Sequence, residues 1–373
     1  MTTATKPWVV IPTTKLQNLL QKISKGLHKN QYAISTQIGL RFDSKSAILT
    51  LGVTDRINYV MVQEFDVSGL DFNITVSFEI FNKLIQKITT ENVTLTVDTP
   101  KLVVKGNGKY HIDLLMEPDG DEPQMFPDFP TPLGNGVGTL SIQTLKEVGQ
   151  ALKAARTEDT NEYVLTGYYF NNKAVTTNQI LMAIHDTKLF ETSFLMSPEL
   201  MDTLSSLTIP EVTVYRENNR IWFISEAISI YAEEMENAEM YEAAYERIME
   251  ADAAKCPSFC YVESDDLLEA IKRLKIVEAA YSKSVVHVTF VPEGVTLKSE
   301  DNSGVETVSY SSDLFNSIYE TFLDLNMLED VVKSHGGTTL RPKELTIEYG
   351  AETVVRINSG EITHILTVVE GEG

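Results

Sequence analysis

The first apolar stretch of the chain predicts a short strand followed by an amphipathic helix. Residues 9–11 form an uninterrupted apolar run, and Thr13 and Thr14 place hydroxyl groups where a helix N-cap would lie. Leucine and isoleucine then recur at intervals of three and four residues, which is the spacing of one helix face. That face consists of Leu16, Leu19, Leu20, Ile23 and Leu27, and the opposite face carries Lys15, Gln17, Asn18, Gln21, Lys22 and Lys25. The opposite face contains no acidic residue, so the predicted helix is cationic.

This strand–helix pattern occurs six times. The strands begin near residues 9, 74, 139, 194, 259 and 308, so the first members of successive pairs lie about 120 to 130 residues apart. The helices after the later strands are predicted over residues 78–88, 145–155, 267–276 and 314–322, with a further helix that begins at Pro198. The repeat predicts an α+β fold of three tandem domains, each made of two strand–helix units, over residues 1–120, 121–245 and 246–373.

The segments between these helices alternate apolar and polar residues. Residues 47–53, 93–97, 212–215 and 285–291 are examples, and all are rich in β-branched side chains. A period of two is typical of strands that bury one face. Each helix is therefore predicted to cover a small, mostly antiparallel sheet.

Two segments are predicted to connect the domains. Residues 117–123 combine acidic residues with proline and glycine, and prolines at 127, 130 and 132 follow. Proline and glycine at this density interrupt regular structure, and the acidic spacing does not match a calcium-binding loop, so a solvated connector is predicted. Residues 233–254 are rich in glutamate and alanine, which favours a partly helical second connector.

Length and composition fit a multidomain globular protein. The chain has 373 residues, of which 43% are hydrophobic, enough to build cores in each domain. The N-terminus does not resemble a signal peptide and no apolar run approaches the length that spans a membrane, so a cytoplasmic location is expected. Cys256 and Cys260 form a lone C-x3-C pair, which excludes a disulfide framework and does not favour zinc.

Charge separates three of the helices from the rest of the chain. The formal net charge is -22, which disfavours general binding to nucleic acid. Residues 15–27, 78–88 and 144–156 nevertheless hold eight basic and two acidic residues, a net charge of +6 that leaves -28 elsewhere. These faces are either solvated surfaces with chance charge or a shared surface that faces a polyanion. The residues predicted to face DNA under the second interpretation are Lys15, Lys22, Lys25, Lys29, Lys83, Lys87, Lys146, Lys153, Arg156, Lys272, Arg273 and Lys275.

The sequence contains no recognisable catalytic constellation. The six histidines are scattered and none lies in an HExxH motif, and the GxxxxGK[ST], GxGxxG and GxSxG motifs are absent. We therefore expect no enzymatic activity, no cofactor and no metal. Repeated basic helices without reactive groups instead suggest a scaffold that contacts DNA through its phosphates, which position a protein without reading the base sequence.

Several short motifs in a fixed order add a family resemblance. They are Leu51-Gly52-Val53-Thr54-Asp55, Met125-Phe126-Pro127-Asp128-Phe129-Pro130, Leu165-Thr166-Gly167, residues 174–184, Tyr245-Glu246-Arg247-Ile248 and residues 363–369. With the six strand–helix units, these motifs make the chain similar to the bacterial sliding clamp, the beta subunit of the replicative DNA polymerase holoenzyme. The resemblance extends from Val9 to about Val369.

The resemblance implies a DNA-clamp fold and a processivity factor. Two copies would form a head-to-tail homodimer, a ring whose helices line a channel around double-stranded DNA and whose antiparallel sheets lie outside. The ring would tether a replicative polymerase and other replication or repair proteins, and a separate ATP-driven clamp loader would open it. Tyr110 and Ile112 of one copy would meet Ile276 and Val277 of the other. Ordinary core or edge packing is the alternative for these four residues.

The resemblance also implies a hydrophobic pocket between domains two and three that binds short partner peptides through apolar anchors. Carried over by position, its residues are Leu165, Thr177, Met182, Arg247, Ile248, Thr367, Val368 and Val369. Several positions depart from the family pattern. Residues 178–182 replace Asp-Gly-His-Arg-Leu, Ala243 and Val368 replace prolines, and Glu370 replaces a basic residue. A more apolar and less cationic pocket is predicted, and core packing is the alternative for Leu165 and Met182.

Two alternatives stay open at this point. The departures from the family pattern fit a phage-encoded or accessory clamp as well as the main clamp of a host. A non-enzymatic structural protein of the virion type, built of repeated α+β units, is the competing function.

Overall fold

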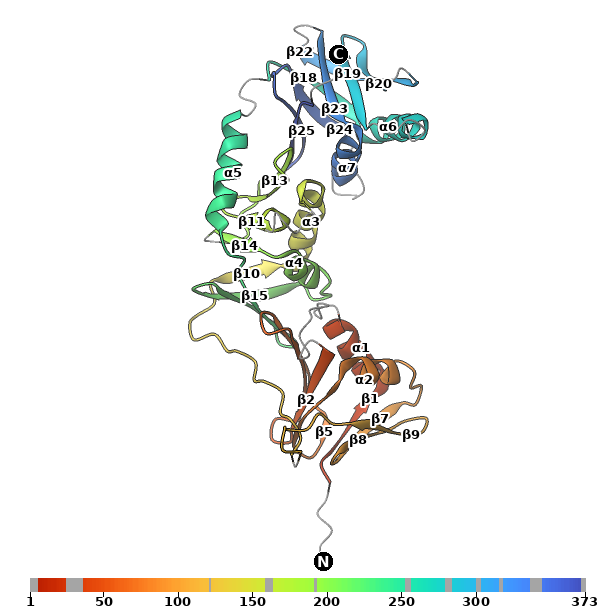
Figure 1. Ribbon diagram of the computed structural model, residues 1–373, viewed down its shortest axis with the longest axis vertical. Coiled ribbons are helices and arrows are strands. Elements are labelled where there is room, and N and C mark those ends of the chain that lie inside the picture. The colour runs from red at the N-terminus through yellow and green to blue at the C-terminus, as the bar shows by residue number, and fades with distance from the viewer. Residues whose placement is uncertain are drawn as a thin grey trace, which may run out of the picture. The chain divides into compact units, whose positions relative to one another are not determined.

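The computed structural model of the protein describes residues 6–24, 36–120, 122–157, 164–190, 193–251, 256–278, 284–299, 303–314, 318–335 and 344–369. The chain divides into two compact units, one formed by Met1–Gln143 and Glu199–Glu234 and the other by Thr144–Pro198 and Met235–Gly373. Each unit combines helices with antiparallel sheets (Figure 1), so the predicted α+β class is confirmed. The boundaries of the three expected domains stay a prediction.

The first unit contains a five-stranded sheet, β5-β1-β7-β8-β9, and an eight-stranded sheet, β10-β15-β16-β17-β4-β3-β2-β6. In the larger sheet β17 pairs with β4, which places Ile228 opposite Val62 and Tyr231 opposite Tyr59. The sheet therefore continues without a break between strands far apart in sequence. The elements are β1 (Trp8–Pro12), α1 (Thr13–Ser24), β2 (Gln37–Asp43), β3 (Ile48–Thr54), β4 (Tyr59–Glu64), β5 (Ser68–Gly69), β6 (Phe72–Ser77), α2 (Phe78–Ile85), β7 (Asn92–Asp98), β8 (Lys101–Lys105), β9 (Lys109–Asp113), β10 (Gly138–Ser141), α4 (Pro198–Ser205), β15 (Glu211–Glu217), β16 (Arg220–Ile224) and β17 (Ile228–Glu233).

The second unit contains a nine-stranded sheet, β14-β11-β12-β13-β26-β25-β24-β18-β22, and a four-stranded sheet, β21-β20-β19-β23. The pairing of β13 with β26, from Leu181 opposite Leu366 to His185 opposite Ile362, makes the larger sheet continuous. The elements are α3 (Ile142–Leu152), the 3-10 helix η2 (Lys153–Ala155), β11 (Tyr168–Phe170), β12 (Ala174–Thr177), β13 (Leu181–His185), β14 (Phe194–Met196), α5 (Ala238–Ala251), β18 (Ser258–Glu263), α6 (Ser264–Glu278), β19 (Val285–Val291), β20 (Gly294–Ser299), β21 (Val305–Ser309), β22 (Ser311–Leu314), β23 (Tyr319–Asp324), α7 (Leu325–His335), β24 (Glu344–Tyr349), β25 (Val354–Ser359) and β26 (Ile362–Thr367).

The first five predicted strand–helix units are present as β1–α1, β6–α2, β10–α3, β14–α4 and β18–α6. In α1 the predicted apolar stripe is buried from Leu16 to Ile23, while Leu27 lies outside the described residues. Pro198 is the first residue of α4, where the missing N–H leaves no intrahelical bond unmade. The spacing of apolar residues therefore located these helices correctly.

The sixth predicted helix is wrong. Residues 311–314 and 319–324 are strands, and the helix that follows them is α7, which begins only at Leu325. Leu314, Ile318 and Phe322 are spaced by four residues, which fits one face of a strand as well as one face of a helix. The helix begins where the Asp324 carboxylate accepts hydrogen bonds from the backbone N–H groups of Asn326 at 2.8 Å and Met327 at 2.9 Å.

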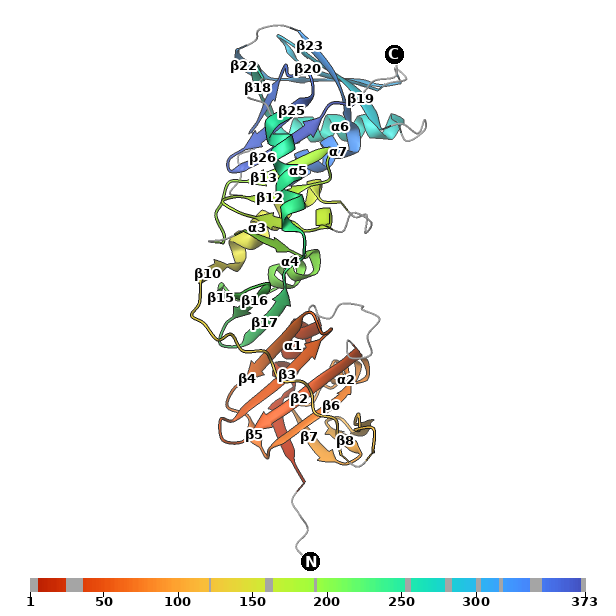
Figure 2. The same ribbon diagram turned by 60° about the vertical axis from the view of Figure 1, so that its left-hand side comes forward.

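The first predicted connector is not solvated along its whole length. Residues 117–120 are exposed, but the following segment crosses one face of β2, β3 and β4 (Figure 2). Phe126 is buried there, and the Tyr59 hydroxyl donates a hydrogen bond to the Pro127 carbonyl at 2.7 Å. Further along, the indole N–H of Trp222 donates to the Pro130 carbonyl at 2.7 Å. The connector is therefore packed on the eight-stranded sheet.

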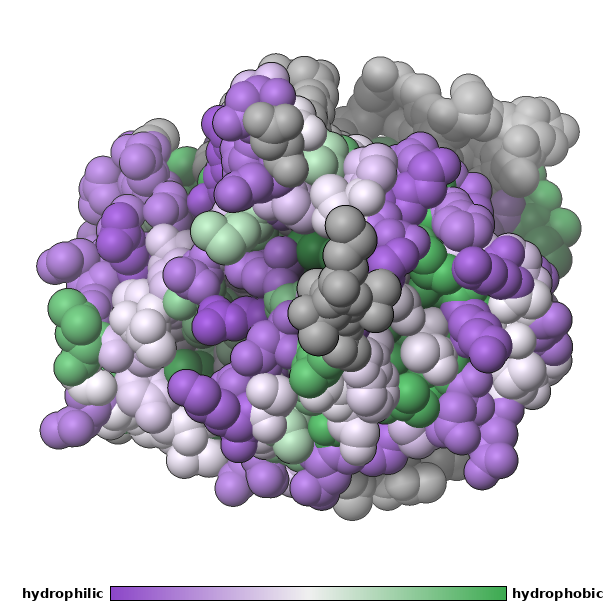
Figure 3. Space-filling view, turned by 90° about the horizontal axis from the view of Figure 1, so that it is seen from below, coloured by the Kyte–Doolittle hydropathy of each residue, from purple (hydrophilic) through white to green (hydrophobic). Residues whose placement is uncertain are grey.

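The face that Figure 3 shows is mostly polar. Seen from below, hydrophilic residues cover most of the visible face and apolar residues form small separate groups (Figure 3). Across the described residues, no helix combines the length and the apolar character needed to cross a membrane.

Candidate nucleic-acid and partner interfaces

Helices α1 and α2 lie side by side in the first unit, and Gln17 joins them. Its side-chain amide donates to the carbonyls of Ile85 and Ile88, both at 3.0 Å. Because the apolar stripes of both helices face the sheets, their polar residues share one exposed surface. That the basic residues of these two helices form one DNA-facing surface stays a prediction.

Carboxylates partly neutralise that surface. Lys15 forms an ion pair with Glu64, and Lys83 pairs with Glu79 one turn away on α2. The hydrogen bond to Glu64 raises the pKa of Lys15, and the hydrogen bond from Lys83 lowers the pKa of Glu79. Lys22 and Lys87 make no ion pair with any residue that the structure describes. Lys25 and Lys29 lie outside the described residues.

The basic residues of α3 and η2, together with Arg156, differ in how exposed they are to solvent. Lys153 is exposed and Lys146 is half-buried. The guanidinium carbon of Arg156 lies 6.0 Å from the centre of the Tyr168 ring, a cation–π distance. Arg156 therefore points towards a buried tyrosine, whereas Lys153 is the most accessible of these three predicted DNA-facing residues.

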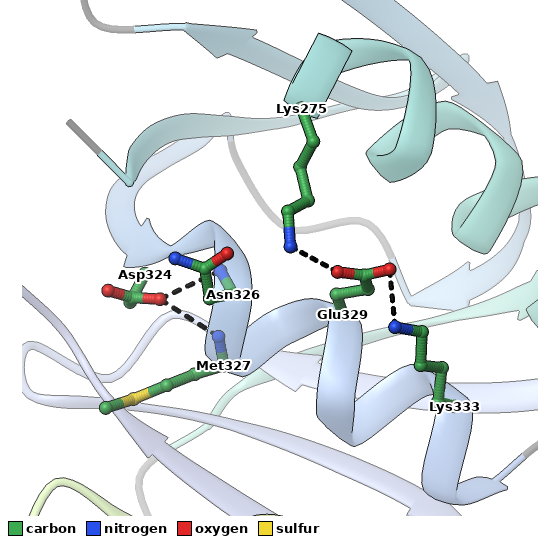
Figure 4. A network of polar contacts seen from close by, with 6 residues as sticks. All are labelled: Lys275, Asp324, Asn326, Met327, Glu329 and Lys333. Atoms are coloured by element: carbon green, nitrogen blue, oxygen red, sulfur yellow. Dashed lines mark hydrogen bonds and ion pairs between the residues drawn. The ribbon is translucent and has the colours of Figure 1, made fainter. Parts of the chain in front are cut away.

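Helices α6 and α7 hold a second set of ion pairs in the second unit. Lys272 pairs with Glu269 at 2.8 Å, and Arg273 donates to both carboxylate oxygens of Glu306 at 2.9 and 2.8 Å. Figure 4 shows that Lys275 of α6 and Lys333 of α7 each form an ion pair with a different carboxylate oxygen of Glu329. The Lys333 Nζ atom lies 2.6 Å from Oε1 of Glu329. All three predicted basic residues of α6 thus bind carboxylates.

Glu329 is buried, yet it stays ionised. Burial favours the neutral acid, but hydrogen bonds from Lys275 and Lys333 outweigh burial and lower the pKa of Glu329. Two ammonium groups around one carboxylate leave a local charge of +1. Sequence reasoning missed Lys333 and Glu329 because it placed the last helix too early; the apolar stripe of residues 325–335 was the available signal.

The four predicted dimer-contact residues lie on two different elements. Tyr110 and Ile112 are on β9, an edge strand of the five-stranded sheet, where Tyr110 is exposed and Ile112 is buried. Ile276 and Val277 are near the end of α6, where Ile276 is 76% exposed. An exposed edge strand and an exposed isoleucine are both features that an interface can cover.

The predicted pocket residues all belong to the second unit, and their grouping into one pocket stays a prediction. Met182 and Thr177 are fully buried and Leu165 is nearly so. Leu165 and Met182 belong to an apolar cluster that includes Tyr169, Val175 and Tyr241. Arg247 is exposed on α5, and Thr367, Val368 and Val369 are half-buried at the end of β26. Ile248 lies in α5, with its side chain outside the described part.

The hairpin between β12 and β13 joins the end of β26. The backbone N–H of Thr367 donates to the Ile180 carbonyl at 2.9 Å, and the Thr367 hydroxyl donates to the same oxygen at 2.9 Å. These bonds bring the substituted segment 178–182 next to Thr367 and Val368. Two of the substituted family positions, the segment 178–182 and Val368, therefore lie close together in the fold, while Glu370 lies outside the described residues.

Among the described residues, no three His, Cys, Asp or Glu side chains come together to hold a metal ion. Cys260 is buried, and burial raises the pKa of its thiol to about 12. A thiol with so high a pKa is a weak nucleophile at neutral pH.

Comparison with known proteins gives a clear result at the level of structure. Neither a comparison with protein families nor one with curated proteins finds a match. The solved Bacillus subtilis DNA polymerase sliding clamp is 15% identical, with 98% of this chain and 100% of that chain covered and a TM-score of 0.83. The Thermotoga maritima DNA polymerase III beta subunit is 18% identical, with 98% of this chain and 99% of that chain covered and a TM-score of 0.79. The Pseudomonas aeruginosa DNA polymerase III subunit beta is 14% identical, with 97% of this chain and 100% of that chain covered and a TM-score of 0.81.

The protein therefore has the fold of a DNA sliding clamp. Within that class, the structures that it matches over nearly the whole of both chains include the beta subunits of DNA polymerase III from Thermotoga maritima and Pseudomonas aeruginosa. The fold implied by the sequence resemblance is confirmed.

Proposed function

We propose that the protein is a DNA polymerase processivity factor, a homodimeric ring that encircles duplex DNA and tethers a polymerase to it without catalysing a reaction. The observation that carries the proposal is the fold likeness to sliding clamps, which spans nearly the whole of both chains. The cationic surface of α1 and α2 in a chain of net charge -22 supports it. Tethering would raise the effective concentration of the polymerase at the primer end.

In this proposal the basic side chains of α1, α2, α3 and α6 face the duplex. Lys15, Lys83 and Arg273 already hold carboxylates. A phosphate must compete with these carboxylates, so each contact is weak and exchanges readily as the ring moves along DNA. The acidic remainder of the chain would repel phosphate and so limit binding of DNA outside the channel.

The proposal also assigns partners. A replicative polymerase and a clamp loader would dock at the junction that contains Leu165, Met182, Thr367, Val368 and Val369. The ring would close through β9 of one copy and the region of Ile276 in the other. Three tandem domains per chain, at 1–120, 121–245 and 246–373, would give a six-domain ring.

The test is topological retention on DNA. The protein is loaded onto a circular plasmid with ATP and the clamp loader of its source, and half of the sample is then cut once with a restriction enzyme. We expect co-migration with intact circles in gel filtration and loss from the linear DNA, with a free-protein mass of twice the 41.7 kDa chain. Equal retention on both DNA forms would refute the ring mechanism, and a large assembly would favour a structural protein.

A further inference from the structure

Two histidines that take no part in the candidate interfaces are in contact inside the second unit. His335 is the last residue of α7 and His364 lies within β26, and neither side chain has any exposed surface. The Nε2 atom of His335 lies 2.9 Å from the Nδ1 atom of His364, which is a hydrogen-bond distance. The two ring centres are 4.7 Å apart, with the planes at 72°. This contact joins the end of α7 to β26.

The second ring nitrogen of His364 contacts α3. Its Nε2 atom lies 3.1 Å from the Ala151 carbonyl oxygen and 3.3 Å from the Ser334 hydroxyl. A carbonyl oxygen only accepts hydrogen bonds, and the Ser334 hydroxyl already donates its hydrogen to the Val331 carbonyl at 2.6 Å. Both groups are therefore acceptors, which requires a hydrogen on Nε2 of His364. The histidine pair thus connects three elements, because Ala151 belongs to α3.

The contact between the two rings limits how many protons the pair can hold. A hydrogen bond between ring nitrogens needs one N–H group and one bare nitrogen, and a protonated imidazole has no bare nitrogen. At least one of the two side chains is therefore neutral in the folded protein. If both were protonated, two N–H groups would face each other at 2.9 Å, and two positive charges would lie in contact away from water. The joined pair therefore holds at most one added proton.

The charged groups near the pair on the two helices have other partners or lie at the surface. On α7, Lys333 forms an ion pair with Glu329 at 2.6 Å, and Asp330 is exposed. After α3, Lys153 is exposed and Arg156 lies over an aromatic ring. These charges are therefore held by other groups or by water rather than by the imidazoles.

On the neighbouring strands, one further histidine faces the same side of the sheet. The residue opposite His364 on β13 is Ala183, and His185 lies two positions further along, which is the same face. The Nδ1 atom of His185 lies 3.9 Å from the Glu361 carboxylate, so a proton added to His185 gains an ion pair. On β25 the residue opposite His364 is followed back by Arg356, whose side chain is on the other face. His185 therefore opposes any acid effect of the pair and needs its own control.

Acid favours separation of the two rings. A solvated histidine has a pKa of about 6.5, so below about pH 5.5 both side chains are protonated when apart, against at most one proton when joined. The contribution of the pair to stability is therefore complete at neutral pH and is lost as the pH falls. Each proton that only the separated state binds shifts the equilibrium towards that state about tenfold per pH unit.

We propose that His335 and His364 form an acid-sensitive latch, which holds the end of α7 and β26 against the Ala151 carbonyl of α3 at neutral pH and releases α3 when both rings are protonated. The latch opens without breaking a sheet, because β26 stays paired with β13 and β25. Since α3 and α7 belong to the second and third predicted domains, release loosens the contact between these domains. The inference goes beyond the proposed function and does not depend on it.

The test is amide hydrogen exchange of the full-length protein, measured by mass spectrometry at about pH 7.5 and about pH 5 and corrected for the intrinsic pH dependence of exchange. In the wild type, protection of residues 145–155 and 329–335 should fall about fivefold or more at the lower pH. Helices α1 and α2 serve as the internal reference and should not change. Glu329 stays ionised at about pH 5, because its pKa lies below 4.5, so its ion pairs do not contribute to the loss.

The decisive variant combines His335→Gln with His364→Gln, because a glutamine amide donates and accepts hydrogen bonds but takes up no proton. Its protection over the same residues should differ by less than about twofold between the two pH values. His185→Gln is the matched control and should lose protection as the wild type does. Unchanged protection in the wild type, or an equal loss in the double variant, would overturn the proposal.

A second measurement decides if the double variant does not fold. Hydrogen exchange at the imidazole C2 atoms of the wild type follows the protonation of each ring. Uptake of a single proton by the pair above about pH 5.5 supports the latch, and independent protonation of both rings near about pH 6.5 refutes it. None of these measurements involves DNA, so the proposed clamp function is tested separately.

Discussion

The ring of Phe126 lies directly over Gly39, and a β-carbon built on Gly39 would fall 2.2 Å from the Cγ atom of Phe126. Gly52 on the neighbouring strand has the same role, since its β-carbon would lie 2.7 Å from the Tyr59 hydroxyl. β2 and β3 therefore lack side chains at the place where the connector docks. This pairing of glycine with an aromatic ring fixes the connector on the eight-stranded sheet.

A Gly39→Ala substitution should destabilise the first unit. The added methyl group overlaps the Phe126 ring, so either the ring leaves its site or the strand shifts. We expect the free energy of unfolding to fall by about 1–3 kcal/mol, measured by urea denaturation. Gly138→Ala is the matched control, because no atom lies within 4 Å of the β-carbon built there. Equal effects of the two substitutions would show that Phe126 does not hold the connector.

Glu329→Gln should destabilise the second unit in a pH-dependent manner. The amide cannot hold the charges of Lys275 and Lys333, so we expect a loss of about 1–2 kcal/mol at pH 7. The pKa of Glu329 is lower in the folded protein than its ordinary value of 4.5, so its stabilising contribution is complete above that value and is lost as the pH falls through the folded-state pKa. Unfolding of the wild type and the variant should therefore differ at pH 7 and converge at acid pH. A difference that stays constant with pH would mean that packing, not charge, is lost.

Local periodicity was sufficient to predict the first five helices. Each follows a short strand, and its apolar residues are spaced by three and four positions. The sixth failed because Leu314, Ile318 and Phe322 satisfy both helical and strand spacing. The chain there forms β22, which pairs with β18, and β23, which pairs with β19. Such pairing joins residues that are distant in the chain, so no local pattern reveals it.

The candidate site was predictable in part. Charge patterning found the cationic faces of α1 and α2, but it could not show that Lys15 and Lys83 would meet Glu64 and Glu79. The resemblance grouped Leu165 and Met182, which do share one cluster. It gave no sign that Tyr241 of α5 would join the same cluster, although Tyr241 and Tyr245 have the spacing of one helix face.

The unpaired and paired lysines of the first unit should differ in their effects on DNA binding. Lys22→Gln and Lys87→Gln each remove a cation that no described carboxylate holds, so each should lower the slope of log affinity against log salt by about 1. Glu79→Gln releases Lys83 and should strengthen binding instead. The measurement is fluorescence anisotropy of a short duplex over a range of salt concentrations. Weaker binding of the Glu79→Gln variant would mean that this part of α2 does not face DNA.

Ile276→Glu should convert the proposed dimer to monomers without unfolding them. Ile276 is 76% exposed within one chain, so a charge there costs the fold little, but burying that charge in an interface is strongly unfavourable. We expect the dimer dissociation constant to rise about 100-fold, measured by analytical ultracentrifugation, with an unchanged circular dichroism spectrum. Ile318→Glu is the matched control, since Ile318 is 62% exposed and lies outside the predicted contact. If both variants stay dimeric, the ring closes through other residues; if both dissociate, the interface extends beyond α6.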